Sequence, residues 1–124
     1  MFSINYRDAR PIYEQVKDGL RVAILTGAMQ KDEKCPSVRE LAGQLAINPN
    51  TIQKAYRELE AEGYIYSVPG KGNFVSECRE AMSLRKTELY AKLDGTVTEL
   101  MHVGETADSI SAHIRNFASR EART

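Results

Sequence analysis

The chain has 124 residues, of which 42% are hydrophobic and 27% are charged, the composition of an ordinary globular protein. This length excludes a large two-domain enzyme. Seventeen Lys and Arg residues balance seventeen Asp and Glu residues, so the net charge alone gives no support for a polyanionic partner. The sequence has no apolar run of membrane-spanning length, and Asp8 and Arg10 interrupt the region where a signal peptide would lie. We therefore expect a cytoplasmic protein without a membrane partner.

The cysteines and histidines form no recognisable metal or redox pattern. Cys35 and Cys78 make no CxxC pair, and they lack the density of a secreted disulfide scaffold. His102 and His113 match no zinc-ligand spacing. We expect reduced thiols, no metal site and no cofactor.

The first predicted element is an amphipathic helix over residues 11–26. Ile12, Val16, Leu20 and Ile24 recur at steps of four residues, which places them on one face of a helix. Pro at the first helical position and Gly just past the end are the residues favoured at helix termini, and residues 11 and 27 fit these positions. The polar stretch that follows, 30–34, is predicted to be a loop.

A second helix is predicted to begin at Ser37. The Ser37 side chain can cap it, and Glu40, three residues on, can return the hydrogen bond as a capping box. The helix ends near Ala46, because the Asn48-Pro49 dipeptide cannot continue it.

The same dipeptide predicts the start of a third helix, with Asn48 as its cap and Pro49 in its first turn. This helix runs to about Glu62 and ends at Gly63, a residue favoured in the left-handed closing position. About three residues therefore separate the second helix from the third.

An extended pattern replaces the helical one over residues 64–75. Two short apolar stretches flank the turn-forming residues 69–72, which predicts a β-hairpin. Three helices followed by a hairpin form a winged helix-turn-helix. The predicted fold is mainly α with a small β-hairpin, and residues 1–76 form its winged helix-turn-helix domain.

Residues 77–124 are predicted to form a tail of two helices. Each helix carries an apolar stripe, and so short a segment buries too little surface to stand alone. A second copy of the chain is the simplest partner, which predicts a homodimer. The residues expected to form the dimer interface are Leu89, Leu93, Val97 and Leu100 on the first helix, and Ile110, Ile114 and Phe117 on the second.

The third helix carries the strongest functional signal. Its inward face is predicted to hold Ile52, Ala55, Tyr56 and Leu59, and its outward face Asn50, Gln53, Lys54 and Arg57. All four outward side chains are hydrogen-bond donors, and no carboxylate lies among them. Amide side chains can bridge an adenine edge in the major groove, while Lys and Arg can bind guanine or phosphate. A plain solvated helix surface remains the alternative for this stripe taken alone.

Two further features favour DNA as the partner. Arg39 lies on the outward side of the second helix, and Lys71 lies at the tip of the hairpin between two glycines. A hairpin tip this slim can enter or straddle a minor groove and bring Lys71 close to phosphates.

The run PSVRELAGQLAINPNTIQKAYRELEAEGYIYSVPGKGNFV, with PIYEQVKDGLRVAILTG upstream, resembles the DNA-binding domain of the GntR family of bacterial transcription regulators. The segments NPNT, AYRELEAEGYI and PGKGNFV are most similar to those of the YtrA-like subgroup, whose short two-helix tail serves dimerisation. The resemblance implies a repressor that binds an operator in double-stranded DNA. It implies contacts to DNA from Arg39, Asn50, Thr51, Gln53, Lys54, Gly70 and Lys71, and Arg57 joins them from the outward face of the helix.

Three departures from the family pattern are visible. Cys35 replaces a commonly apolar residue, and the loop 31–34 lacks the usual Pro-Gly turn. Pro49 and Gln53 occupy positions where other branches of the family carry arginines. Operator sequences from those branches are therefore not expected to apply, and neither the target genes nor a small-molecule effector can be identified from these residues.

Two other classes of function compete with this interpretation. Some relatives fuse this domain to an enzyme-like fold that binds pyridoxal phosphate, but the sequence shows no catalytic pattern and no GxxxxGK[ST] phosphate loop. The second alternative is a winged-helix module that binds protein, or serves only as a dimerising adaptor. The donor-only face of the third helix argues against it, because a protein-binding surface has no reason to exclude both acids and apolar residues.

Overall fold

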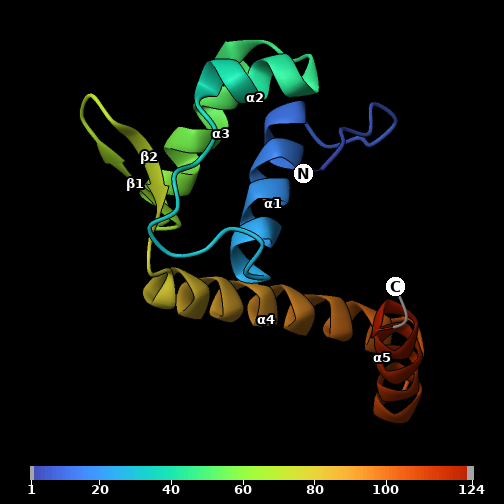
Figure 1. Cartoon of the computed structure of the whole chain (residues 1–124). Coiled ribbons are helices and arrows are strands. Elements are labelled where there is room, and N and C mark those ends of the chain that lie inside the picture. Colours follow the sequence, from blue (N-terminus) through green and yellow to red (C-terminus); the bar gives the residue numbers. More distant parts are fainter. Residues whose placement is uncertain (1, 123–124) are drawn as a thin grey trace. The chain divides into compact units, whose positions relative to one another are not determined.

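The computed structural model describes residues 2–122, which contain five helices and one two-stranded sheet (Figure 1). In chain order the elements are α1 (Ile12–Leu25), α2 (Val38–Leu45), α3 (Pro49–Ala61), β1 (Ile65–Val68), β2 (Gly72–Val75), α4 (Arg79–His102) and α5 (Ala107–Ala122). The chain divides into two compact units, 1–82 and 83–124. Residues 1, 123 and 124, which end the two predicted domains, lie outside the described residues.

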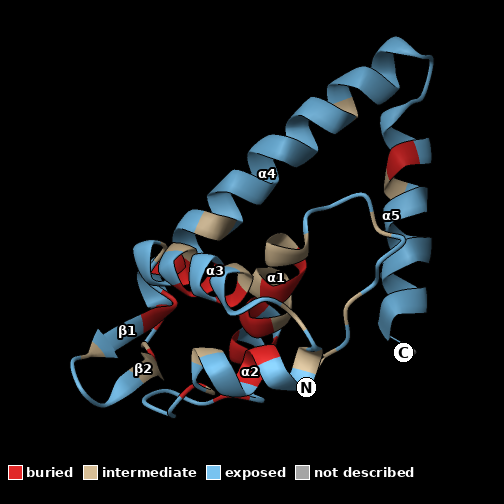
Figure 2. Ribbon diagram, turned by 90° about the horizontal axis from the view of Figure 1, so that it is seen from above, coloured by how far each residue is buried: buried red, intermediate tan, exposed pale blue. Residues whose placement is uncertain are grey.

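The first unit has one apolar core, formed by α1, α2, α3 and the hairpin (Figure 2). Val16, Leu41, Ile52 and Leu59 are fully buried, and each comes from the apolar stripe of its helix. The first turn of α4 joins the same core through Ala81. The predicted mainly α fold with a small β-hairpin is confirmed.

The helix ends follow the predicted chemistry with two differences. Pro11 is the N-cap of α1 rather than its first helical residue, so α1 begins at Ile12. The Ser37 hydroxyl accepts a hydrogen bond of 3.1 Å from the Glu40 N–H, as predicted. Within residues 2–122, however, the Glu40 side chain accepts no bond in return, so only half of the predicted capping box forms. One satisfied donor is enough to cap so exposed a helix end.

The turn between α2 and α3 is tight. Asn48 Oδ1 accepts a hydrogen bond of 2.8 Å from the Asn50 N–H, and Pro49 occupies the first helical position, both as predicted. Ala46 closes α2 in the left-handed conformation with φ of 55°, and the Ile47 N–H bonds back to the Ala42 carbonyl at 3.0 Å. This short, doubly capped connection fixes the direction in which α3 leaves α2.

The hairpin pairs residue 65 with residue 75 and residue 68 with residue 72. The predicted loop over residues 30–34 is wrong at its end, because Lys34 forms a bridge to Phe74. The Cys35 N–H donates to the Asn73 carbonyl, and the Val75 N–H donates to the Glu33 carbonyl, both at 2.9 Å. These backbone groups satisfy the edge of β2 that does not pair with β1, and the polar residues Glu33 and Lys34 showed no strand pattern in the sequence.

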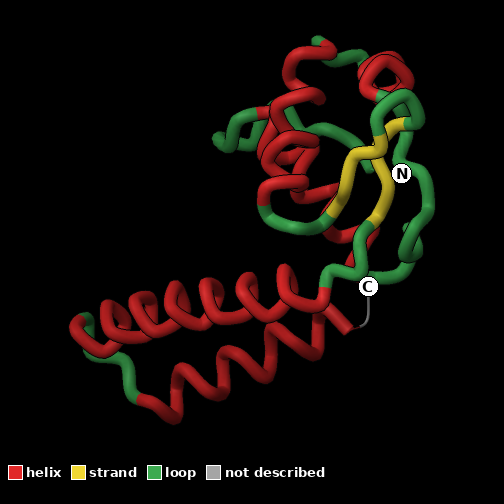
Figure 3. Tube along the Cα trace, turned by 90° about the vertical axis from the view of Figure 1, so that its left-hand side faces the viewer, coloured by secondary structure: helices red, strands yellow, loops and turns green. Residues whose placement is uncertain are grey.

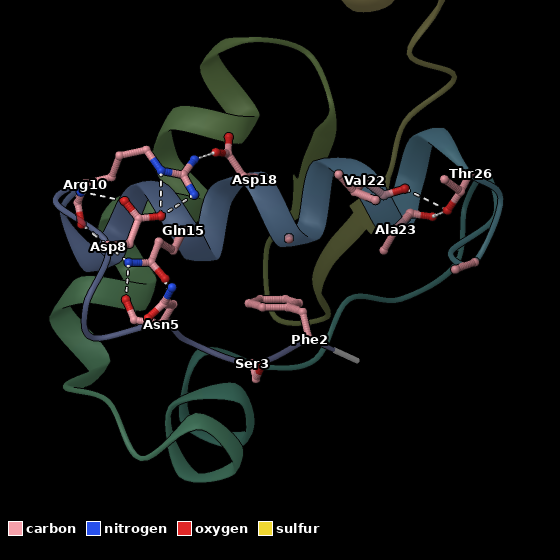
Figure 4. A pocket seen from close by; sticks show the side chains of 12 residues that line it. Phe2, Ser3, Asn5, Asp8, Arg10, Gln15, Asp18, Val22, Ala23 and Thr26 are labelled. Carbon is pink, nitrogen blue, oxygen red and sulfur yellow. Dashed lines mark hydrogen bonds and ion pairs between the residues drawn. The ribbon is translucent and has the colours of Figure 1, made fainter. Parts of the chain in front are cut away.

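The N-terminal segment packs along α1 (Figure 4). The Asn5 N–H donates to Gln15 Oε1 at 2.8 Å, and Gln15 Nε2 donates to the Asn5 carbonyl at 2.9 Å. The Phe2 ring lies so close to Gly19 that a Cβ on this glycine would come within 2.5 Å of a ring atom. The absence of a side chain at residue 19 therefore makes room for the ring.

The second unit consists of the rest of α4 and of α5, which turns back from the end of α4 (Figure 3). Gly104 makes the turn with φ of 100°. Thr106 and Ser109 then cap each other: the Ser109 N–H donates to Thr106 Oγ1 at 3.1 Å, and the Thr106 N–H donates to Ser109 Oγ at 3.0 Å. None of the helices in residues 2–122 combines the length and the apolar character needed to cross a lipid bilayer.

Candidate nucleic-acid interface

Helix α3 separates its side chains as the sequence predicts. Ile52, Ala55 and Leu59 are fully buried and Tyr56 is nearly so, with its hydroxyl donating to the Pro36 carbonyl at 2.6 Å. This inner face holds the helix against α1 and α2. The outer face carries the predicted donors, and the exposed ones are Asn50, Gln53, Lys54 and Arg57.

The N-terminal end of α3 is open for contacts. Asn48 and Pro49 satisfy or remove the first orphan amides of the helix, and Asn50 is exposed directly after them. Thr51 is half-buried, so less of it is available than of its neighbours. The first turn contains no acidic residue, which leaves the positive end of the helix dipole uncompensated.

The remaining predicted DNA-contact residues lie on two other elements of the same unit. Arg39 is exposed on α2, and Gly70 and Lys71 are exposed at the tip of the hairpin. The Lys71 N–H donates to the Val68 carbonyl at 2.9 Å and closes the turn. Gly70 adopts φ of 77°, a conformation in which glycine is favoured, so the tip carries few side-chain atoms besides those of Lys71.

The acidic residues at the C-terminal end of α3 have partners on neighbouring elements. Lys17 on α1 forms ion pairs with Glu58 at 3.0 Å and with Glu62, and Arg21 contacts Glu62 at 3.3 Å. Burial lowers the pKa of the Lys17 ammonium, but the hydrogen bonds to Glu62 and Glu58 outweigh this effect and leave that pKa above its usual value. The Glu60 carboxylate accepts a hydrogen bond of 2.5 Å from the Ser67 hydroxyl.

The cations of the predicted contact set are not paired in this way. Within residues 2–122, no carboxylate forms an ion pair with Arg39, Lys54, Arg57 or Lys71. The balanced net charge of the chain therefore conceals a separation: the described cations of α1 are neutralised, whereas those of the predicted contact set keep their charge for an outside partner.

Two residues beside this site were missed by sequence reasoning. The Lys54 ammonium lies 3.8 Å from the centroid of the Tyr13 ring. Lys34 runs along the hairpin, where a Cβ on Gly72 would come within 3.2 Å of Lys34 Cε, and it adds a second cation to that element. No local pattern links residues 13 and 54, or 34 and 72, because only the packing of distant segments brings them together.

Both cysteines are buried. Burial, with a smaller contribution from Glu33, raises the pKa of the Cys35 thiol to about 11. The thiol is therefore neutral near pH 7, which disfavours reaction. In the described part of the chain, no group of three His, Cys, Asp or Glu side chains is placed to hold a metal ion.

The predicted dimerisation residues lie on the described helices of the tail. Ile110 is buried within its own unit, and Val97 is half-buried. The other five stay exposed although they are apolar, with fractional exposures of 47% for Leu89, 39% for Leu93, 36% for Leu100, 46% for Ile114 and 52% for Phe117.

Comparison with known families gives a direct match. The family described as "Bacterial regulatory proteins, gntR family" matches residues 12–75, which contain α1, α2, α3 and the hairpin. All eight predicted DNA-contact residues fall in this range.

Characterised and uncharacterised bacterial regulators are similar to this chain. It is 47% identical over 77 residues to the HTH-type transcriptional repressor YtrA of Bacillus subtilis, a match that covers 62% of this chain and 59% of the repressor. It is 33% identical over 113 residues to the uncharacterised HTH-type transcriptional regulator YhcF of the same organism, covering 90% and 93% of the two chains. The match to the YtrA repressor thus spans less than two thirds of that protein's length.

Solved structures agree with these relatives. A transcriptional antiterminator from Listeria monocytogenes superimposes with a TM-score of 0.79 at 33% identity, over 95% of this chain and 90% of the other. The DNA-binding domain of AraR in complex with operator ORE1 superimposes with a TM-score of 0.54 at 34% identity, over 61% and 93%. These relatives are regulators rather than enzymes. Because the family match covers residues 12–75, more than half of the chain, this chain belongs to the GntR family of bacterial transcription regulators.

Proposed function

We propose that the chain is a sequence-specific transcription repressor, which binds a palindromic operator in double-stranded DNA as a homodimer. The observation that carries this proposal is the outer face of α3. It exposes four hydrogen-bond donors, and in the described residues no carboxylate forms an ion pair with the two cations among them. Asn50 and Gln53 lie in the N-terminal half of α3, the part of a recognition helix that reaches base edges. The operator complex of the similar AraR domain supports DNA as the partner.

The contacts from α2 and from the hairpin complete the proposed interface. Arg39 takes a backbone phosphate at the edge of the major groove, and Lys71 takes one at the adjacent minor groove. These contacts fix the register of α3 along the duplex, while Gln53 and Asn50 read sequence. Because the chromosome of a bacterium lies in the cytoplasm, we place the protein there.

The homodimer is proposed from the apolar residues of the tail. Five of the seven predicted residues expose more than a third of their surface, which is unfavourable unless a second surface covers them. A twofold dimer presents two copies of α3 to successive major grooves about 34 Å apart, which requires an inverted repeat in the operator. Occupancy of such a site blocks transcription by RNA polymerase.

Selection of random duplexes at near-physiological salt tests the proposal, with the mass of the protein in solution measured beside it. We expect enrichment of an inverted repeat by a dimer. The Gln53→Ala/Lys54→Ala variant should lose the specific binding and keep its thermal unfolding midpoint, because both side chains are exposed. The matched control is Gln30→Ala/Lys92→Ala, which removes the same two chemical groups outside the interface and should bind like the wild type.

Two outcomes contradict the proposal. Specific binding that survives in the Gln53→Ala/Lys54→Ala variant shows that α3 does not read the operator. An intact dimer that enriches no sequence supports the alternative, a winged helix that binds a protein partner.

A further inference from the structure

Lys54 is the one predicted DNA-contact residue among those described whose charged group rests on an aromatic ring. Its ammonium lies 3.8 Å from the centroid of Tyr13, within the range of a cation–π contact. Tyr13 belongs to the first turn of α1, and its hydroxyl lies 3.4 Å from Glu14 Oε1. The two helices pack side by side, so this contact joins neighbouring elements of the core (Figures 1 and 2).

The contact belongs to a row along the packed faces of α1 and α3. Residues 13, 17 and 21 of α1 are one helical turn apart. They meet residues 54 and 58 of α3 and residue 62 at its C-cap, which have the same spacing. At the second and third positions a cation of α1 neutralises a carboxylate of α3. At the first position the order changes: the cation belongs to α3, and a neutral ring of α1 faces it.

This change has an electrostatic consequence. A carboxylate at residue 13 would hold Lys54 and also cancel its charge. The Tyr13 ring holds the ammonium through its quadrupole and adds no net charge. Within residues 2–122 Lys54 makes no ion pair, so its charge stays available although its position is restricted. A flexible lysine that is already ordered loses less rotamer entropy when it binds.

We propose that Tyr13 is a positioning residue, which holds the Lys54 ammonium ready for a phosphate of the DNA backbone. The Lys54 side chain leans from α3 toward α1, where its ammonium meets the Tyr13 ring. In the proposed complex, backbone phosphates line the walls of the groove that α3 enters, so a cation at the flank of α3 is suited to one of them. A compact ammonium suits a phosphate as a point charge. This inference rests on the proposed function, and Tyr13 acts in it through Lys54, without touching DNA.

The free protein offers a test that needs no DNA. Protons next to the ammonium, above the face of a ring, resonate upfield of their usual position. We expect this shift for the Lys54 ε-methylene in the wild type and in Tyr13→Phe, and its loss in Tyr13→Leu. An unshifted resonance in the wild type overturns the inference.

The second test is a double-mutant cycle on DNA binding, measured against salt with the selected operator and with a random duplex. Tyr13→Leu should weaken binding of the dimer by about 4- to 25-fold, because each of its two subunits loses the roughly two- to five-fold expected from a cation–π contact at an exposed site. Tyr13→Phe should bind like the wild type. Lys54→Met should reduce the salt slope of the dimer by about two, because one phosphate contact is lost in each subunit. In the Lys54→Met background Tyr13→Leu should have no further effect, and the effects should be equal on both duplexes, because a phosphate contact is independent of sequence.

Three results separate the possible failures. An equal loss from Tyr13→Leu with and without Lys54→Met overturns the inference, because Tyr13 then acts on DNA by itself or through the fold. A loss in Tyr13→Phe also overturns it, because the hydroxyl would then be needed. Wild-type protein that binds neither duplex overturns the proposed function, whatever the resonance of Lys54 shows. Thermal unfolding of each variant checks that the fold is intact.

Discussion

At the scale of single residues, Gly19 shows how packing can reverse an intrinsic preference. Glycine inside a helix costs about 1 kcal/mol relative to alanine, so Gly19→Ala would ordinarily stabilise α1. Here the added Cβ would come within 2.5 Å of the Phe2 ring, and the ring must leave the helix. We expect the gain from Gly19→Ala to be cancelled or reversed while Phe2 is present, and to return to about 1 kcal/mol in the Phe2→Ala background.

Gly43 in α2 provides the matched control, because a Cβ there would meet no atom within 4 Å. Gly43→Ala should stabilise the protein by about 1 kcal/mol in either background. Urea unfolding of the four Phe2 and Gly19 combinations, with the Gly43 control beside them, measures these differences. If Gly19→Ala stabilises as much as Gly43→Ala while Phe2 is present, the ring does not pack on the helix in solution.

At the scale of elements, the ion pairs between α1 and α3 fix the helix that we propose to read DNA. Lys17 has a side-chain exposure of only 15%, and it contacts Glu58 of α3 and Glu62 at the C-cap of that helix, which lie one helical turn apart. Lys17→Met leaves two half-buried carboxylates facing each other with one cation fewer. We expect a loss of about 1–2 kcal/mol in the free energy of unfolding, measured by urea denaturation at low salt.

Arg10→Met is the comparison for an exposed pair. Arg10 contacts Asp8 at 2.9 Å, and its side chain is 49% exposed, so solvent already screens the interaction. This variant should lose less stability than Lys17→Met does, because the Arg10 pair is exposed to solvent. Equal losses for Lys17→Met and Arg10→Met would show that the pairs between α1 and α3 contribute no more than surface pairs do.

The elements also show what could be predicted from the sequence. The helices follow from apolar residues at four-residue steps and from caps such as Asn48, because these signals act within one turn of the chain. The bridge of Lys34 to Phe74 could not be foreseen, because it is formed by backbone groups of segments far apart in sequence. The site follows the same division: the outer face of α3 is a local pattern, whereas the contact of Lys54 with Tyr13 depends on how two helices pack.

The C-terminal end of α2 could be predicted from the sequence only in part. A stop near Ala46 follows from the Asn48-Pro49 dipeptide, which cannot continue a helix. The left-handed conformation of Ala46 itself does not follow, because alanine is unfavourable there by roughly 1–2 kcal/mol relative to a right-handed residue. The cap of α3 and the return bond to Ala42 enforce it together.

At the scale of the whole molecule, the proposed dimerisation of the tail decides whether one or two copies of α3 meet the DNA. Leu93 is apolar and 39% exposed on the stripe of α4 that we propose to bury in the dimer. Leu93→Glu places a charge in that interface, where it has no partner, and should yield a monomer of 13.9 kDa in sedimentation equilibrium. The first unit has its own core, so the helical circular dichroism of α1, α2 and α3 should persist.

Leu84 makes the control stringent, because it undergoes the same chemical change on the same helix. It is 65% exposed. Leu84 lies nine positions before Leu93, which at about 100° per residue places the two side chains on opposite sides of α4. Leu84→Glu should therefore leave the dimer intact. If both variants dissociate, or neither does, the stripe carrying Leu93 is not the interface.

The monomeric variant should also show how the two DNA-binding units of the proposed dimer contribute to operator affinity. A dimer with about six to eight phosphate contacts should give a log-log salt slope of about −5 to −7, and a monomer on one half-site should give about half of that. In the dimer, the second DNA-binding unit binds at a high effective concentration once the first is bound. Leu93→Glu should therefore weaken operator binding by about 10²–10⁴-fold. An isolated half-site should bind the wild type and the variant with similar affinity per DNA-binding unit. If Leu93→Glu has the mass of a monomer and still binds the operator with unchanged affinity, each DNA-binding unit acts alone and the inverted repeat is not required.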